Sequence, residues 1–155
     1  MTILNHEIHI AASPEKVWKL LSDLTSVQFY NPDVASARFA SKQKEGVGAS
    51  RECNLRPKGA VIERVTVWEP KSSLGLEVTK SDWPIVFMKW QTNLAPDNGG
   101  TRLSQDMEYQ LKFGAIGRLM DSLVMRRKLD NAIREVFSNL KRYVEDGGDK
   151  RSVIT

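Results

Sequence analysis

The last third of the sequence places the strongest constraint on the fold. After Gly114, apolar residues recur every three or four positions to about residue 145, and no proline interrupts them. This spacing predicts an amphipathic helix, which over residues 115–145 would be about 45 Å long. Its apolar stripe consists of Ile116, Met120, Leu123, Ile133, Val136, Phe137, Leu140 and Val144. A helix of this length needs a large apolar surface to cover the stripe, and the preceding residues must supply it.

Residues 34–112 supply that surface as strands joined by short turns. The expected strands are residues 34–40, 47–55, 60–68, 74–80, 85–94 and 101–112. Among the turns, Pro96-Asp97-Asn98-Gly99-Gly100 is the clearest hairpin signal. Short connections between successive strands favour an antiparallel meander.

The N-terminal residues add one strand and two short helices. Glu7-Ile8-His9-Ile10 alternates polar with apolar residues, which is typical of a half-buried strand. Ser13-Pro14-Glu15 is a helix start, because Ser13 can cap the first backbone N–H groups and Pro14 suits the first helical position. A short irregular or helical stretch over residues 26–30 ends at the turn Asn31-Pro32-Asp33. The sequence therefore predicts an α+β fold in which a curved antiparallel sheet wraps around a long C-terminal helix.

Length and composition indicate one soluble globular domain. The chain has 155 residues, of which 41% are hydrophobic and 27% charged. We expect the domain to span residues 1–146 and residues 147–155 to form a flexible tail. No apolar run approaches the roughly 20 residues of a membrane span, and the N-terminus lacks the features of a secretory signal. Cys53 is the single cysteine, so no disulfide can form within the chain. Together these features lead us to expect a cytoplasmic protein without integral membrane association.

The net charge of +4 raises the possibility of a nucleic-acid partner. Arg126-Arg127-Lys128 is the only dense basic cluster, and Asp121 and Asp130 flank it. No aromatic residues interleave the cluster to stack on bases. We interpret it as a solvated helix face and expect no nucleic-acid partner; the protein is expected to be a monomer or a homodimer.

Alternation along the strands assigns side chains to the inner face of the sheet. In the last strand, Leu103, Gln105, Met107, Tyr109 and Leu111 alternate with residues that are all polar. The same parity places Val86, Met88, Trp90, Thr92 and Leu94 inside in the strand before it. Taken with the other strands and the helix stripe, the residues expected to line a cavity are Arg51, Cys53, Val65, Val67, Leu76, Met88, Trp90, Gln105, Met107, Tyr109, Met120 and Leu123.

Three of these inner-face residues are polar: Arg51, Gln105 and Tyr109, and Glu63 joins them if Val65 faces inward. A buried polar group without a partner costs about 1–3 kcal/mol, so each must meet another group, water or a ligand. One interpretation places them at strand ends or on backbone partners. The other has them orient a ligand in a mainly apolar cavity.

Recognisable catalytic chemistry is sparse. His6 and His9 are three residues apart on a strand and point to opposite faces, so they cannot share a metal ion. With no other histidine and one cysteine, we expect no metal site and no cofactor. Acid–base catalysis would fall to Arg51, Glu63 or Tyr109, whose pKa values burial would have to shift.

The order of elements and several motifs resemble the START-like (SRPBCC) superfamily, and within it the polyketide cyclase/dehydrase and lipid transport family. The motifs are residues 10–18 (IAASPEKVW), residues 30–34 (YNPDV), residues 46–48 (GVG), residues 63–70 (ERVTVWEP) and residues 100–103 (GTRL), and the resemblance extends from Glu7 to about Glu145. Tyr30 is a mild departure, because the family usually has tryptophan there. The resemblance implies the helix-grip fold, with two short helices after the first strand. It also implies a cavity between sheet and helix that holds lipids, sterols, polyketides or plant hormones, and a minority of members are enzymes.

Three hypotheses about function follow. The first is a non-catalytic binding or carrier domain for a small hydrophobic ligand, which the scarcity of polar inner-face residues favours. The second is a polyketide cyclase or dehydratase, which requires Arg51, Gln105 or Tyr109 to converge on one point of the cavity. The third is a protein-interaction module that uses the helix or Trp83-Pro84 as its contact surface, and it predicts a filled core without a pocket.

Overall fold

The computed structural model describes residues 1–147, so residues 148–155 of the expected tail lie outside the described residues. Its centre is a seven-stranded antiparallel sheet with the order β1-β7-β6-β5-β4-β3-β2. The strands are β1 (Thr2–Ile10), β2 (Val34–Phe39), β3 (Ser50–Leu55), β4 (Ala60–Glu69), β5 (Ser73–Ser81), β6 (Ile85–Asp97) and β7 (Gly100–Leu111). Strands β2 to β7 pair with their neighbours in sequence, which confirms the predicted meander.

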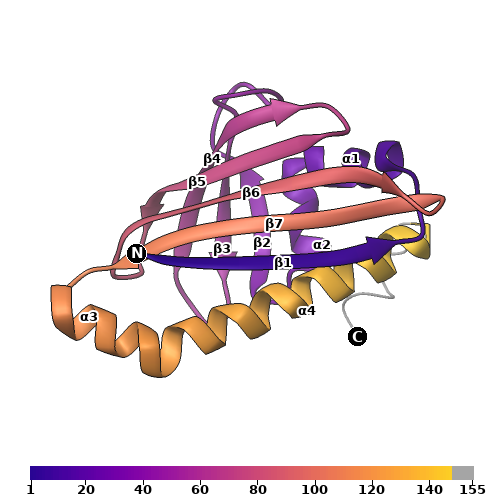
Figure 1. Ribbon diagram of the computed structural model, residues 1–155. Helices are drawn as coiled ribbons and strands as arrows, with labels where there is room; N and C mark the ends of the chain where they lie inside the picture. The colour runs from indigo at the N-terminus through magenta and orange to yellow at the C-terminus, as the bar shows by residue number, and fades with distance from the viewer. Residues whose placement is uncertain (148–155) are drawn as a thin grey trace.

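Helices connect the two edges of the sheet and cover one of its sides. Helix α1 (Pro14–Ser22), the 3₁₀ turn η1 (Leu24–Ser26) and α2 (Val27–Tyr30) lead from edge strand β1 to edge strand β2. After β7 follow α3 (Gly114–Met120), the π-helical turn η2 (Asp121–Met125) and α4 (Arg126–Glu145). Figure 1 shows α4 running along the curved sheet, which confirms the predicted α+β fold. Within residues 1–147, every helix is too short or too polar to cross a membrane.

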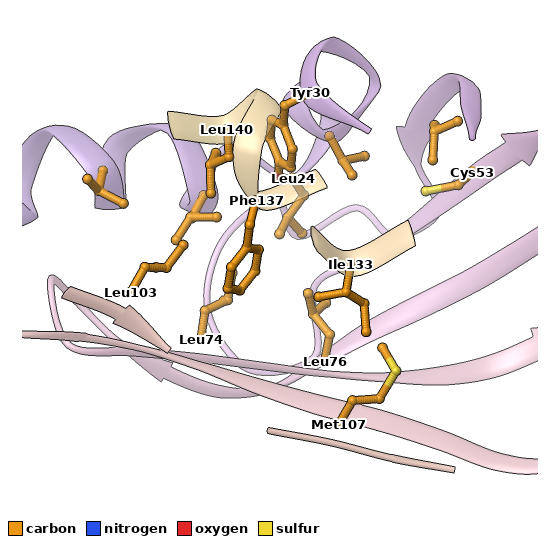
Figure 2. Packing of buried hydrophobic residues seen from close by; sticks show 14 of the residues in the cluster. Leu24, Tyr30, Cys53, Leu74, Leu76, Leu103, Met107, Ile133, Phe137 and Leu140 are labelled. Carbon is orange, nitrogen blue, oxygen red and sulfur yellow. The ribbon is translucent and has the colours of Figure 1, made fainter. Parts of the chain in front are cut away.

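The C-terminal half of α4 is attached to the sheet by apolar packing and by polar contacts at its end. Ile133, Phe137, Leu140 and Val144 are buried, and Figure 2 shows Ile133 and Phe137 pointing toward side chains of the sheet. At the end of the helix, Glu145 Oε2 accepts a hydrogen bond from the Ala11 N–H at 2.7 Å. This end of α4 is therefore fixed beside the end of β1.

Local signals in the sequence account for the turns that shape the sheet. The Ser13 side chain accepts a hydrogen bond from the Lys16 N–H, and Pro14 begins α1, as predicted. Asn98 and Gly99 have φ values of 48° and 79° and join β6 to β7 in a two-residue turn. A type I′ turn requires positive φ at both positions, which Asn-Gly supplies at little cost. The observed β6 nevertheless continues through Pro96 to Asp97, beyond the expected end at residue 94.

Two β-bulges change the predicted direction of side chains. In β6 the register shifts between Ile85 and Phe87, and Val86 is exposed rather than inward-facing. In β4 the register shifts between Val65 and Val67. As a result Trp68 turns inward and packs edge-on against Trp18, with ring centroids 5.2 Å apart. A bulge adds one residue to a strand and so reverses the alternation beyond it.

The predicted single helix over residues 115–145 is divided, and its first part faces solvent. Ile116, Met120 and Leu123 are all more than half exposed. The side turned to the sheet carries Gly117 and Asp121 instead. A Cβ atom at Gly117 would lie 2.0 Å from the Lys112 carbonyl oxygen, so only glycine allows this close approach. The periodicity was right for a helix here, but the apolar side is turned away from the sheet.

Two leucines on opposite sides of the fold test this arrangement. Leu24 is fully buried in η1, whereas Leu119 in α3 is 60% exposed. We expect Leu24→Ala to lower the free energy of unfolding by about 2–5 kcal/mol, because it leaves a cavity in the core. The matched change Leu119→Ala should cost less than about 0.5 kcal/mol. Urea unfolding followed by circular dichroism measures both, and equal losses would contradict the outward orientation of α3.

Candidate functional site

A cavity of about 600 Å³ lies between the inner face of the sheet and α4. Strands β3 to β7 line its floor, α4 forms its roof, and Leu21, Val27 and Tyr30 from the short helices close one side. Most lining side chains are apolar.

The cavity opens to solvent at one end. Its exposed lining residues are Asp33 just before β2, Arg56-Pro57-Lys58 between β3 and β4, Trp83-Pro84 between β5 and β6, and Lys128, Asn131 and Glu135 on α4. These residues form the mouth. It lies where β6 begins and β5 ends, away from the end at which Glu145 of α4 accepts the Ala11 N–H.

The structure brings together seven of the residues that the sequence placed in a cavity. They are Arg51, Cys53, Leu76, Met88, Trp90, Gln105 and Met107, and all line this space. Each lies in a stretch of strand where alternation is unbroken between it and its neighbours on the inner face. Their role in binding stays a prediction.

The other five lie elsewhere. Val65 is buried in the core without reaching the cavity, and Val67 follows the bulge in β4. Met120 and Leu123 are exposed on the segment that faces solvent. Tyr109 is inward-facing and fully buried, but its hydroxyl donates a hydrogen bond to the Asp121 carboxylate, away from the cavity. Burial and this hydrogen bond raise the pKa of Tyr109 above its usual value.

Sequence reasoning expected a helix contribution from Met120 and Leu123 and missed the helix residues that do line the cavity. Tyr30, Leu129 and Phe137 line it, yet none was among the expected cavity residues. Phe137 belonged to the predicted helix stripe, so its periodicity was an available signal. The position of Tyr30 depends on how the short helix α2 returns to the sheet, which no local pattern reveals.

The main polar feature of the cavity is an ion pair between neighbouring strands. Arg51 and Glu63 are direct partners in the β3–β4 register, and Arg51 Nε lies 2.7 Å from Glu63 Oε1. Arg51 Nη1 also donates to the Leu24 carbonyl oxygen at 2.9 Å. Burial alone would lower the pKa of Arg51, but the Glu63 carboxylate outweighs it and the pKa is raised. The guanidinium is therefore held as a fixed cation inside an apolar space.

Two weak acids lie near this pair. Burial raises the pKa of Tyr30, although the nearby Arg51 opposes the shift. Burial and the Glu63 carboxylate raise the pKa of Cys53 to about 12. Both groups are thus neutral at physiological pH, so neither is prepared to act as a nucleophile or a base.

A second polar pair lies on the opposite part of the inner face. Thr92 and Gln105 are partners in the β6–β7 register, and Thr92 Oγ1 donates to Gln105 Oε1 at 3.1 Å. Both side chains line the cavity. The polar cavity residues thus form hydrogen bonds with each other or with the backbone. Their remaining donor and acceptor positions can contact a bound molecule.

Histidines and acidic residues do not gather in this space. His6 lies on β1, where Nε2 is 2.7 Å from Asp130 Oδ1, and it does not line the cavity. Between residues 1 and 147, no three His, Cys, Asp or Glu side chains are grouped closely enough to hold a metal ion. What the site offers is an apolar volume with a few fixed polar contacts.

A curved sheet gripping a C-terminal helix, with an apolar cavity between them, defines the START-like class of hydrophobic ligand-binding domains. The chain belongs to the polyketide cyclase/dehydrase and lipid transport family, whose sequence model matches residues 1–145. This confirms the resemblance drawn from the sequence. No curated protein matches the chain significantly.

Solved structures share the fold at low sequence identity. TTHA0849 from Thermus thermophilus has a TM-score of 0.80 and 18% identity, over 96% of this chain and 100% of that one. Ara h 8.0201 has a TM-score of 0.76 and 14% identity, over 94% and 99%. A START superfamily protein from Mycobacterium smegmatis has a TM-score of 0.74 and 15% identity, over 93% and 97%. Likenesses at this identity establish the fold and leave the ligand open.

A double-mutant cycle tests the energetic coupling of the ion pair. Arg51→Met and Glu63→Leu should each lower the free energy of unfolding by about 3–5 kcal/mol, because each leaves a buried charge without its partner. The double variant should be more stable than the sum of the two losses implies, by about 1–3 kcal/mol. Chemical denaturation of the four proteins gives the coupling. Strictly additive losses would contradict the paired arrangement.

The shifted pKa of Cys53 predicts slow alkylation. The thiolate is the reactive species, and a pKa of about 12 instead of the ordinary 9.0 lowers its population at pH 8 by on the order of a thousandfold. Iodoacetamide should therefore label the native protein far more slowly than the urea-unfolded protein. The native rate should keep rising with pH beyond pH 10, and a plateau near pH 9 would contradict the shift. Mass spectrometry is unambiguous, since the chain has one cysteine.

Proposed function

We propose that this chain is a non-catalytic binding or carrier protein for a small hydrophobic ligand, lipid-like or polyketide-like, held between the sheet and α4. The observation that carries the proposal is the cavity itself, about 600 Å³ in volume and lined mainly by apolar side chains. Small-molecule sites usually have about 300–1,000 Å³ with a few placed polar groups. Membership of a family that includes lipid transport supports the same conclusion.

The polar pairs suggest what the ligand carries besides its apolar body. Arg51 and Glu63 lie on one part of the cavity wall, and Thr92 and Gln105 on another. A purely apolar ligand would cover these groups without replacing their contacts with water, at a cost in affinity. A ligand with one or two hydroxyl or carbonyl groups satisfies them, and we propose that class.

The enzyme hypothesis has less support. It required Arg51, Gln105 or Tyr109 to converge, but the Tyr109 hydroxyl is bonded to Asp121 outside the cavity. Gln105 is bonded to Thr92. Arg51 is a fixed cation, and the Cys53 thiol beside it has its pKa raised to about 12. These groups can orient a carbonyl, but they are poorly suited to transfer protons near neutral pH.

The interaction-module hypothesis predicted a filled core. The open cavity counts against it as the main function, because an empty apolar space lowers stability unless something occupies it. Trp83 and Pro84, proposed as a contact surface, instead border the mouth of the cavity.

Filling the cavity with a larger side chain should weaken ligand binding. Met88 points into the cavity, whereas Val86, two residues earlier on the same strand, is exposed at the bulge. Met88→Trp should weaken binding of a dansyl-labelled fatty acid by at least about tenfold, because the indole occupies the ligand's volume. Val86→Trp adds the same side chain outside the cavity and should leave the affinity unchanged. Fluorescence titration measures both.

Native mass spectrometry of the freshly purified wild-type protein should detect a retained apolar molecule that Met88→Trp lacks. A wild-type protein that is empty and also fails to bind the labelled fatty acid would overturn the proposal. If the wild-type protein turns over a polyketide substrate and the Arg51→Met variant does not, the enzyme hypothesis is favoured instead.

A further inference from the structure

The segment that joins the sheet to α4 presents apolar side chains to solvent. Here we call these residues the α3 patch: Phe113, Ile116, Leu119, Met120, Leu123 and Val124, each between 55% and 70% exposed. From Ile116 onward they recur at intervals of three and four, so they share one face of α3 and η2. A contiguous exposed apolar surface of this kind is uncommon on a protein that acts alone in water.

Two contacts fix this outward orientation. Gly117 packs against the Lys112 carbonyl oxygen so closely that no other residue fits. One turn later, the Asp121 carboxylate accepts hydrogen bonds from the hydroxyls of Thr2 and Tyr109. On the side of the segment that faces the sheet lie Gly117 and Asp121, and the Asp121 carboxylate is held by hydrogen bonds. The α3 patch cannot turn inward without breaking both contacts.

Phe113 adds an independent observation. Its φ is 75°, in the left-handed region, and its side chain is 70% exposed. A bulky residue at positive φ is strained, and glycine or asparagine would occupy this position at lower cost. Because most of the ring is exposed, packing in the free protein gives little return for this strain, and the stability of the fold does not favour phenylalanine here.

Cations surround the α3 patch. Lys112, Arg118, Arg126, Arg127 and Lys128 lie within or beside it and are all exposed. Asp121 is the only acidic residue between positions 112 and 128, and it is engaged with Thr2 and Tyr109. A helix with an apolar face flanked by lysine and arginine is the pattern of segments that lie in the interface of anionic membranes.

We propose that residues 112–128 dock this protein on the surface of anionic membranes. The α3 patch enters the boundary between headgroups and acyl chains, and the surrounding cations contact lipid phosphates. The segment lies on the bilayer without spanning it. This inference concerns the outer surface and does not depend on the ligand proposed for the cavity.

The α3 patch lies next to the mouth of the cavity, so docking would bring the mouth to the membrane. The Lys112 N–H donates a hydrogen bond to the Pro84 carbonyl oxygen at 2.9 Å, which joins the start of the segment to the mouth of the cavity. At its other end the segment leads into Lys128, which lines the mouth directly. A docked protein would hold the mouth beside the lipid surface. Exchange of an apolar ligand there rests on the proposed function, whereas docking itself does not.

Vesicle flotation of the full chain tests the proposal. Vesicles of phosphatidylcholine with phosphatidylserine should carry the protein upward at low salt, and vesicles of phosphatidylcholine alone should carry much less. The triple variant Ile116→Ser/Leu119→Ser/Leu123→Ser should bind anionic vesicles at least about tenfold more weakly. Arg118→Gln/Arg127→Gln should reduce both the binding and its dependence on salt. Val47→Ser, which removes an apolar side chain that is 61% exposed in another part of the chain, is the matched control and should bind as wild type.

Phe113→Asn separates docking from folding. Asparagine tolerates the left-handed conformation, so the melting temperature should be unchanged or higher, while vesicle binding falls severalfold.

Failure of the wild type to float, equal flotation with neutral vesicles, or unchanged binding by the triple variant would each overturn the proposal. So would a wild-type dimer that the triple variant converts to a monomer without any vesicle binding. Binding of the labelled fatty acid by the triple variant should equal that of wild type, so failure of docking and failure of the ligand proposal give different results.

Discussion

The attachment of the long helix at both ends is the constraint on which the rest of the structure depends. At the C-terminal end, Glu145 accepts the Ala11 N–H and apolar side chains pack against the sheet. At the other end, Asp121 holds the helix to Thr2 and Tyr109 on the neighbouring strands β1 and β7. Between these points α4 crosses the concave side of the sheet, and Asp130 binds His6 of β1 along the way. The cavity exists because the helix is fixed at both ends above a curved surface.

The buried ion pair fits a binding site better than a stabilising element. Removing two charges from water costs several kcal/mol per ion, and a buried pair seldom recovers more than this cost. Arg51 and Glu63 line the cavity wall, where apolar residues of similar size would complete an ordinary core. Their presence is explained if the occupant of the cavity has a polar group for them to contact. Under the proposed function, recognition of that polar group accounts for the pair better than stability does.

Alternation predicted the inner face of the sheet wherever pairing was regular. Along β7 the pairing with β6 and β1 is continuous, and Leu103 to Tyr109 face inward as expected. The predictions for Val86 and Val67 failed at bulges, where one extra residue reverses the alternation. A bulge is set by how two strands pair and twist, and the sequence of one strand does not reveal it. The inward position of Tyr109 was predictable because pairing is regular along its strand. Its partner Asp121 was not, because the sequence does not show which helix residue lies beside that strand.

One side of the long helix carries a sequence signal that the spacing of apolar residues alone does not show. Followed backwards from Ile133 in steps of four, the buried side runs through Leu129, Met125, Asp121 and Gly117. Steps of four drift by about 40° each on a regular α-helix, and the wider π turn at η2 rotates the chain back. The buried side of the helix therefore ends in a glycine and a carboxylate, which cannot form a core. The apolar residues beside this stripe face outward, and their regular spacing fits the membrane-docking surface proposed above.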